Sequence, residues 1–313
     1  MNTLKKPIAF LLGATASGKT ELAINISKHT SVEIISVDSV MVYKGCDVGS
    51  AKPSKEILKH HPHHLIDCIE PTSVFTVSDF VNKSLELIDE IHAKNKLPLF
   101  VGGSMMYFKS LLDGLDDLPQ RNDPYRSELK DIKNDKGIEY LYSLLERVDP
   151  EYAKKINSLD EQRIVRALEV KRLSGKPYSS FIKLNTKKSL KDKYDVHQYA
   201  IYEDDRALLH KRIEERLHTI INSGLIDEVR SLLTKYNVAE DHPIRKSVNY
   251  KQAIAFINQE YDFETFSNKA LFATRQLAKR QITWMRSWQE IGLYNINSSQ
   301  KIEEHIKKLG TSL

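Results

Sequence analysis

A phosphate-binding motif lies near the start of the chain. Residues 13–20 read GATASGKT, which fits G-x-x-x-x-G-K-[ST], and they lie between a short apolar run, Ile8–Leu12, and a stretch with helical spacing, Glu21–Lys28. Glycines let backbone N–H groups curl around phosphate oxygens, and the helix that follows adds the positive end of its dipole. In such loops the lysine, here Lys19, binds a phosphate, and the hydroxyl of Thr20 holds Mg²⁺. The residues predicted to bind phosphate are Gly13, Ala14, Thr15, Ala16, Ser17, Gly18, Lys19 and Thr20.

The loop alone does not identify the phosphate compound, because a pyrophosphate ester would fit it as well as ATP. A later apolar run, Leu97–Val101, is followed by Gly102 and Gly103, without the aspartate that many ATPases place there for magnesium. The sequence also lacks the N-K-x-D motif that reads guanine. A GTPase is therefore not expected.

A second chemically capable residue, Asp38, follows the apolar run Val32–Val37. If that run is a strand of an open parallel sheet, Asp38 lies at the carboxyl edge, where such sheets bind ligands. A carboxylate beside a phosphate loop can serve as a magnesium ligand, as a helix cap or as a general base. The residues alone leave these three interpretations open.

The elements that must position these residues alternate between strands and helices. The predicted strands Ile8–Leu12, Val32–Val37 and Leu97–Val101 are separated by predicted helices over Glu21–Lys28 and Val77–His92. This alternation is typical of an α/β fold, with a parallel sheet covered by helices on both faces. We expect a P-loop NTPase-like core over residues 1–116 and 198–313.

Residues 117–197 differ from this core and predict a helical, basic insertion domain. Helical patterns cover Ile138–Leu145 and Gln162–Leu173, and the stretch Lys183–Asp195 is expected to be a mobile, lysine-rich loop. Residues 120–200 hold 18 Lys and Arg against 13 Asp and Glu. Such a charge excess favours a polyanionic partner, although a solvated helical face would carry it equally well.

After the insertion, the pattern predicts one more strand and then long helices. The strand is Gln198–Tyr202, and the helical segments lie near Arg206–Ser223, Leu225–Tyr236 and Phe266–Trp288. Trp284 and Trp288 lie one helical turn apart, so we expect both in the core rather than on a stacking surface.

Composition excludes several classes of protein. The chain has 313 residues, 41% of them hydrophobic and 28% charged, which is ordinary for a globular protein and disfavours disordered or fibrous classes. The apolar run Ile8–Leu12 is too short to span a bilayer and has no cleavage site of a signal peptide. Two cysteines cannot make a disulfide framework. We therefore expect a cytoplasmic protein without membrane contact.

Four histidines over residues 60–64, with Cys46 and Cys68 in the same region, raise the alternative of a zinc site. Pro62 interrupts the run and breaks the helical spacing that ligands on one helix face would need. We do not expect a metal there.

The order of motifs resembles one family, the bacterial tRNA dimethylallyltransferases, also called tRNA isopentenyltransferases. It is carried, from about Ile8 to Trp288, by the motifs GATASGKT, ISVDSVMVYKGCDVGSAKP, HHLID, VGGSMMYFKSLLDGL, QRIVRALEV and ATRQLAKRQITWMR. The resemblance implies transfer of a dimethylallyl group from dimethylallyl diphosphate to the exocyclic amine of the adenosine on the 3′ side of the tRNA anticodon, with release of diphosphate. It also implies that the P-loop holds a diphosphate rather than ATP, that Mg²⁺ is the cofactor, and that a monomer binds the tRNA anticodon stem-loop.

The resemblance also implies roles for individual residues. Asp38 matches the catalytic aspartate, and Arg216 matches the diphosphate-binding arginine. Thr20, which binds both metal and diphosphate, and Arg216 are expected to be catalytic together with Asp38. The residues that match tRNA-contacting positions are Asp38, Ser39, Val40, Met41, Ser104, Arg126, Gln162, Arg163, Ile164, Val165, Arg166, Lys246, Ser247, Val248, Asn249, Tyr250 and Lys251.

Four places depart from the commoner family pattern. Ala14 replaces proline, Ser104 replaces threonine and keeps the hydroxyl, and Val40-Met41 replaces a more polar pair. Asn249 replaces a glycine, and asparagine is the residue that best tolerates the positive φ that glycine would allow.

Three other functions remain as alternatives. A small-molecule kinase would explain the P-loop but not the basic insertion. An enzyme that prenylates free AMP would not need the insertion either. An RNA-binding P-loop protein without activity would bind no dimethylallyl diphosphate.

Overall fold

The computed structural model describes residues 5–184 and 187–311. The chain divides into two compact units, one formed by Met1–Leu112 and Ser189–Leu313, here called the core unit, and one formed by Asp113–Lys188, here called the helical unit. The boundaries differ from the predicted insertion over 117–197. Residues 189–197 belong to the core unit because Leu190 is buried in its hydrophobic core and a strand begins at Asp195.

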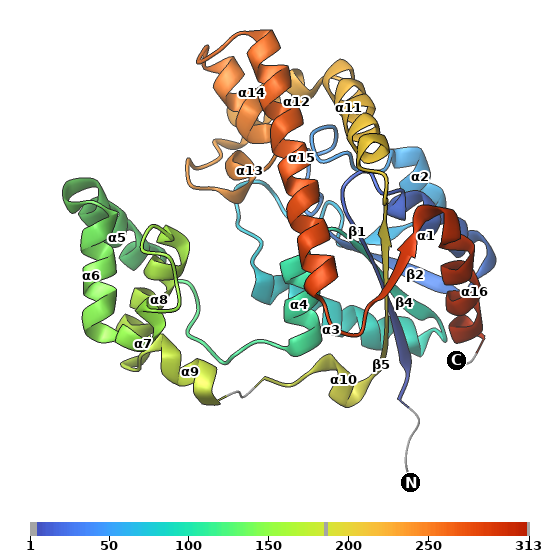
Figure 1. The fold of residues 1–313 in the computed structure, drawn as a ribbon, viewed down its shortest axis with the longest axis horizontal. Coiled ribbons are helices and arrows are strands. Elements are labelled where there is room, and N and C mark those ends of the chain that lie inside the picture. The colour runs from blue at the N-terminus through green and yellow to red at the C-terminus, as the bar shows by residue number, and fades with distance from the viewer. Residues whose placement is uncertain (1–4, 185–186, 312–313) are drawn as a thin grey trace. The chain divides into compact units, whose positions relative to one another are not determined.

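The core unit is built on a six-stranded sheet whose neighbouring strands are all parallel, in the order β3-β2-β4-β1-β5-β6 (Figure 1). The strands are β1 (Pro7–Gly13), β2 (Val32–Val37), β3 (His63–His64), β4 (Leu97–Gly102), β5 (Asp195–Tyr202) and β6 (Gly292–Asn295). This confirms the predicted α/β fold with its parallel sheet. The phosphate-binding loop follows β1, and Asp38 follows β2, so both lie at the carboxyl edge.

Helices cover both faces of this sheet. The helices of the core unit are α1 (Lys19–His29), α2 (Lys55–His60), α3 (Val77–Ala93), α4 (Met105–Asp113), α10 (Leu190–Lys193), α11 (Arg206–Asn222), α12 (Leu225–Tyr236), α13 (Pro243–Lys246), α14 (Tyr250–Ile257), α15 (Phe263–Ser287) and α16 (Ser299–Gly310), with a 3-10 turn η1 (Ile296–Ser298). Successive residues of a strand point to opposite faces, so Phe10 of β1 joins a core with α3, α4, α11 and α15, while Leu11 joins a core with α1 and α16.

The long predicted helices and strands are confirmed, whereas short elements escaped prediction. The segment Lys183–Asp195 contains the end of α9 and the short helix α10, so the expectation of a loop over its whole length was wrong; residues 185–186 lie outside the described part. Leu190 anchors α10 by burial, and Lys193 forms an ion pair with Asp89 of α3.

The helical unit has a hydrophobic core of its own. It consists of α5 (Asp123–Lys136), α6 (Ile138–Val148), α7 (Pro150–Ala153), α8 (Glu161–Ser174) and α9 (Tyr178–Leu184). Leu141, Leu145 and Ile164 are completely buried in this core. The predicted helices over Ile138–Leu145 and Gln162–Leu173 are confirmed as α6 and α8.

None of the helices in residues 5–184 and 187–311 has the length and apolar character needed to cross a lipid bilayer.

Candidate active site

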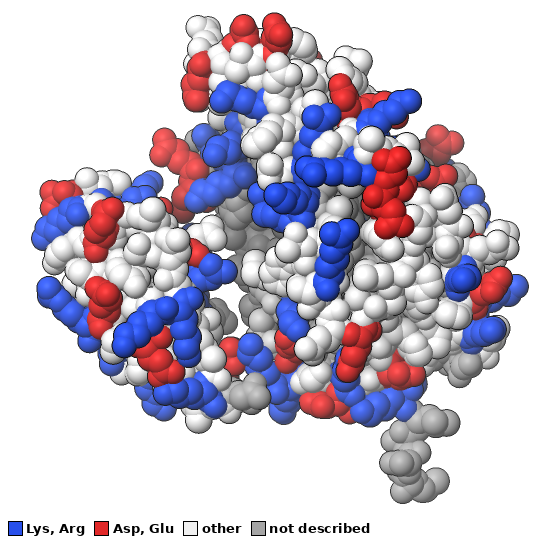
Figure 2. Space-filling view, in the orientation of Figure 1, with Lys and Arg blue, Asp and Glu red and all other residues white. Residues whose placement is uncertain are grey.

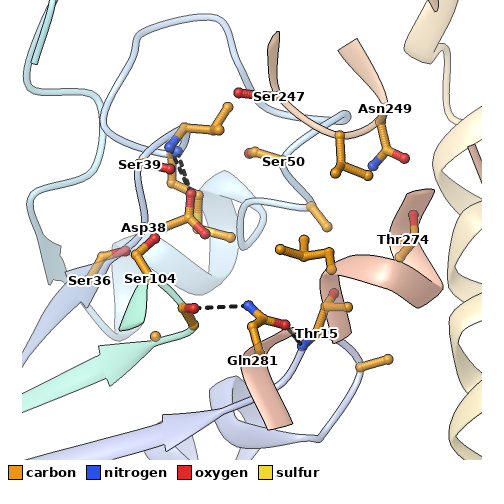
Figure 3. Close-up of a pocket in the computed structure, with 18 of the residues that line it drawn as sticks. Thr15, Ser36, Asp38, Ser39, Ser50, Ser104, Ser247, Asn249, Thr274 and Gln281 are labelled. Atoms are coloured by element: carbon orange, nitrogen blue, oxygen red, sulfur yellow. Dashed lines mark hydrogen bonds between the residues drawn. The ribbon is translucent and has the colours of Figure 1, made fainter. Parts of the chain in front are cut away.

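A cavity of about 590 Å³ opens at the carboxyl edge of the sheet, and every residue that lines it belongs to the core unit (Figure 3). It brings together most of the predicted site residues that lie in this unit. These are Thr15, Ala16, Lys19, Thr20, Asp38, Ser39, Val40, Met41, Ser104, Arg216, Lys246, Ser247, Val248, Asn249 and Tyr250. Gly13, Ala14, Ser17 and Gly18 complete the phosphate-binding loop, and Lys251 lies beside the lining residue Tyr250 on α14.

The loop between β1 and α1 has little room for side chains. A Cβ atom at Gly13 would lie 2.4 Å from Ser17 Oγ, and Gly18 has a φ of 83°, which L-residues rarely adopt. The buried Ser17 Oγ has no hydrogen-bond partner among the described residues. A narrow loop that ends at a helix N-terminus and carries an unpartnered hydroxyl is suited to surround a phosphate group.

Two partly buried cations lie at this loop. Lys19 Nζ donates a hydrogen bond to Ala14 O at 3.1 Å. Burial and, to a smaller extent, the charge of nearby Arg216 lower the pKa of Lys19 to about 8, while Asp38 opposes both effects. Burial also lowers the pKa of Arg216, again opposed by Asp38. One carboxylate thus faces two partly desolvated cations, so an anion bound between them would be strongly favoured.

Asp38 is held in a fixed orientation by its own turn. Its Oδ1 accepts hydrogen bonds from Val40 N at 2.8 Å and Met41 N at 3.1 Å, which leaves Oδ2 outside both bonds. The carboxylate also lines the cavity. Asp38 therefore acts as a turn cap and still offers an oxygen to a ligand.

The sequence analysis missed Gln281 of α15. Its Oε1 accepts a hydrogen bond from Thr15 N, and its Nε2 donates one to Gly103 O, both at 2.9 Å (Figure 3). No local pattern could reveal a contact between residues so distant in the chain. Trp284, one turn further along α15, is 42% exposed and lines the cavity, so the expectation that it lies in the core was wrong. The same expectation is confirmed for Trp288.

A second missed residue, Glu228 of α12, shapes another part of the wall. Its carboxylate accepts hydrogen bonds from three successive backbone N–H groups, of Asp47, Val48 and Gly49, and from the Tyr250 hydroxyl. These bonds fix the loop beside the lining residues 49–51.

Asn249 meets the same loop from α14. Its φ is 72°, so the expectation of a positive φ at this departure from the family pattern is confirmed. Its Nδ2 donates a hydrogen bond to Gly49 O at 2.9 Å. A Cβ at Gly49 would lie 2.6 Å from the Tyr250 ring, so only glycine fits between these elements.

The histidine run does not form a metal site in the described structure. His64 Nε2 pairs with Glu33, His63 Nδ1 bonds to His61 O, and the His61 ring bonds to Ser27. Among the described residues, His, Cys, Asp and Glu side chains form no group of three that could hold a metal ion.

In the helical unit, Arg126 and Arg166 converge on Glu169, which is completely buried. Arg126 donates two hydrogen bonds to Glu169 at 2.7 and 2.8 Å, and Arg166 donates to Glu169 and to Pro119 O. The two arginines and the backbone N–H of Asn122 overcome the effect of burial and lower the pKa of Glu169 to about 2. Both guanidinium groups are therefore tied to the core of the unit.

The neighbouring predicted residues of α8 have different environments. Gln162 and Arg163 are exposed, and the Arg163 side chain, which pairs with Asp160, is 63% accessible. Val165 is half-buried, whereas Ile164 is completely buried and packs in the core. The tRNA contact that the resemblance implies for Ile164 stays a prediction, and its buried side chain is not available for that contact.

Basic side chains also gather over α15 of the core unit, on the face shown in Figure 2. This helix carries Arg275, Lys279, Arg280 and Arg286, and Arg280 lines the cavity. A cationic rim beside a deep pocket suits a polyanionic substrate with one group inserted.

A P-loop, two partly buried cations and a carboxylate at the carboxyl edge of a parallel sheet define a P-loop-type α/β protein with a site suited to a phosphate compound. Comparison with known proteins gives the particular family. The chain belongs to the IPP transferase family, whose model matches residues 41–288.

Individual relatives match nearly the whole chain. A tRNA dimethylallyltransferase of Francisella tularensis (strain WY96-3418) is 42% identical over 308 residues, which cover 98% of this chain and 99% of the relative. The structure of a tRNA isopentenylpyrophosphate transferase from Bacillus halodurans matches with a TM-score of 0.69 at 29% identity, over 98% of this chain and 97% of its own. A tRNA isopentenylpyrophosphate transferase from Staphylococcus epidermidis matches with a TM-score of 0.68 at 29% identity, over 99% of this chain and 100% of its own.

Proposed function

We propose that this protein transfers a dimethylallyl group from dimethylallyl diphosphate to the exocyclic amine of the adenosine on the 3′ side of the tRNA anticodon, and releases diphosphate. One observation carries the proposal: the cavity joins a phosphate-binding loop with partly buried Lys19 and Arg216 to Asp38, whose Oδ2 takes part in neither backbone bond of its turn. The names of its relatives, tRNA dimethylallyltransferase and tRNA isopentenylpyrophosphate transferase, support the same reaction.

The phosphate loop stabilises the leaving group. As the bond between the dimethylallyl carbon and the diphosphate oxygen breaks, negative charge grows on the diphosphate. Lys19 Nζ, the Arg216 guanidinium and the loop N–H groups that are not already bonded to Gln281 or Ala14 would stabilise that charge. Magnesium fits the same place, because Thr20 supplies a hydroxyl and the diphosphate supplies further oxygen ligands. When bound, Mg²⁺ would neutralise part of the leaving-group charge.

Asp38 acts on the amine that accepts the dimethylallyl group. An adenine amine is a weak nucleophile, because its lone pair is delocalised into the ring. As the new nitrogen–carbon bond forms, Asp38 Oδ2 takes a proton from the amine, while the electron pair of the broken bond leaves with diphosphate. The two backbone hydrogen bonds to Oδ1 keep this carboxylate oriented before the substrate arrives.

The RNA partner follows from the position of the reacting amine. A stacked base cannot present that amine to a pocket, so the adenosine must flip out of the anticodon loop. Ser39, Ser104 and residues 246–250 line the cavity that would receive it, and the helical unit would contact the anticodon arm through exposed groups such as Arg163. We also propose that the protein acts in the cytoplasm and as a monomer.

Incubation with unmodified tRNA, dimethylallyl diphosphate and Mg²⁺, followed by mass analysis of the nucleosides, tests this function. The expected product is an adenosine heavier by one dimethylallyl group at the position next to the anticodon. Parallel reactions with ATP alone and with AMP as acceptor test the kinase and the free-nucleotide alternatives. Product from AMP but not from tRNA, or ATP turnover without RNA, would overturn the proposal.

A further inference from the structure

Gln281 joins two loops that form the wall of the cavity. Its amide accepts a hydrogen bond from Thr15 N of the phosphate loop and donates one to Gly103 O after β4, each at 2.9 Å. The side chain is 8% exposed. The orientation of the amide is set by its partners, because a backbone N–H only donates and a carbonyl only accepts.

The loop after β4 is itself tied to the strand that carries Asp38. Ser104 N donates a hydrogen bond to Val37 O, the residue immediately before Asp38, at 3.3 Å. A row of hydrogen bonds therefore runs from the phosphate loop through Gln281 and the 103–104 turn to the base of the Asp38 turn. Figure 3 shows Gln281, Thr15, Ser104 and Asp38 around the same cavity.

Close packing leaves little freedom along this row. A Cβ atom at Gly103 would lie 2.4 Å from Gln281 Nε2 and 3.1 Å from Gly13 O. A Cβ at Gly102 would lie 2.1 Å from Val37 O. These close approaches leave the Gln281 amide little room to shift between the phosphate loop and the end of β4.

We propose that Gln281 is a positioning residue that fixes the distance between the diphosphate held by the P-loop and the proton-accepting oxygen of Asp38. This inference rests on the proposed function. Transfer requires the amine nitrogen and the dimethylallyl carbon within about 3–3.5 Å of each other, and a misplacement of about 1 Å costs on the order of 10²-fold in rate. The two hydrogen bonds of the Gln281 amide, here called the Gln281 bridge, therefore support the chemical step rather than the binding of either substrate.

The first test replaces the amide by a side chain of similar length without polar atoms. Gln281→Met should lower kcat by about 10- to 100-fold, while the KM values for dimethylallyl diphosphate and for tRNA each change less than about threefold. Gln276→Met is the matched control, because Gln276 lies on the same helix but is not part of the cavity wall formed by the described residues. The control should keep the wild-type kcat.

The second test uses a side chain whose donor depends on pH. In Gln281→Glu, an ionised carboxylate still accepts from Thr15 N but repels Gly103 O, whereas a protonated carboxyl group again donates to that carbonyl. The kcat of this variant relative to wild type should therefore rise as pH falls, and the Gln281→Met ratio should stay flat. The ionisable side chains that line the same cavity are present in both proteins, so their common effect on kcat divides out of the ratio; they are Lys19, Asp38, His63, Tyr107, Arg216, Lys246, Tyr250 and Arg280.

The outcomes separate this inference from the proposed function. A wild-type protein that makes no dimethylallylated nucleoside would refute the function itself. An active wild type with a Gln281→Met variant of unchanged kcat, or with a pH-independent ratio for Gln281→Glu, would refute only the role of Gln281. A variant that loses thermal stability but keeps kcat per folded molecule would show that the bridge only supports the fold.

Discussion

At the scale of single residues, the two oxygens of Asp38 have different partners. Oδ1 accepts from the N–H groups of Val40 and Met41, and Oδ2 takes part in neither bond. A turn cap costs the carboxylate only one of its oxygens, so the same residue can also act as a base. The sequence left cap and base as alternatives, and the structure makes them compatible.

This arrangement predicts a clean effect for Asp38→Asn. The amide oxygen can still accept from Val40 N and Met41 N, so the turn should survive, but the side chain can no longer take a proton. The rate of the chemical step should fall by roughly 10²–10⁴-fold, with unchanged affinity for tRNA. Single-turnover kinetics and tRNA titration measure the two quantities. Near wild-type turnover would remove Asp38 from the role of base.

Lys19 predicts a pH dependence for diphosphate binding. Burial and Arg216 lower the pKa of Lys19 to about 8 in the protein without ligand. A cation is needed to bind the anion, so affinity should be highest below that pKa and should fall as pH rises through it, by up to about tenfold per pH unit.

Calorimetric titration of inorganic diphosphate between about pH 7 and pH 9.5 measures this fall. Lys19→Met, which has no charge to lose, should bind more weakly and show a flatter profile over the same range. Equal pH profiles for wild type and variant would show that Lys19 does not control binding.

At the scale of elements, hydrophobic periodicity predicts the long and regular helices and strands. β1, β2, β4, α3, α6 and α8 follow from patterns of apolar residues, because each buries a face over several turns or along a whole strand. β6, with only Gly292–Asn295, has no period to recognise and exists because it pairs with β5, far earlier in the chain. The roles of Gln281 and Glu228 could not be predicted for the same reason, since their hydrogen-bond partners are set by tertiary contacts.

The helix α8 carries a stability prediction. Glu169 is buried and bound by Arg126 and Arg166, so Glu169→Gln leaves two guanidinium groups without their anion. We expect a loss of about 3 kcal/mol in the free energy of unfolding, the lower end for a buried pair because both arginines are partly exposed. Glu161→Gln on the same helix removes only the exposed pair with Lys133 and should cost less than about 1 kcal/mol.

The interaction of Glu169 with its two arginines also predicts that the helical unit loses stability in acid. The pKa of Glu169 is lowered to about 2 from its ordinary value of 4.5, so the stabilisation by this carboxylate is present above pH 4.5 and is lost as pH falls toward 2. Denaturant unfolding at several pH values measures it. If wild type and Glu169→Gln lose stability in parallel over that window, the carboxylate does not stabilise the unit.

At the scale of the whole molecule, the arginines of the helical unit fall into two groups, those bound within the unit and those exposed on its surface. Arg126 and Arg166 serve the unit's own core, whereas Arg163 is exposed. Arg163→Ala should therefore weaken tRNA binding and reduce its salt slope by about one unit, with no change in diphosphate binding. Arg166→Ala should mainly lower stability. A wild-type salt slope in Arg163→Ala would exclude this residue from phosphate contact.

The junction between the two units makes the division of labour directly testable. Ser189 Oγ donates a hydrogen bond to Leu112 O at 3.0 Å, so the two ends that excision of residues 113–188 would leave are neighbours in the core unit. A short glycine linker can close that gap at little entropic cost.

Because every residue that lines the cavity remains, the shortened protein should bind inorganic diphosphate within about threefold of the full chain. Without the basic helical unit it should bind tRNA at least about tenfold more weakly and with a shallower salt dependence. Circular dichroism and diphosphate titration verify that the core unit has folded. A folded, diphosphate-binding core that keeps full tRNA affinity would assign recognition of the anticodon arm to the cationic face of α15, and the helical unit to another task.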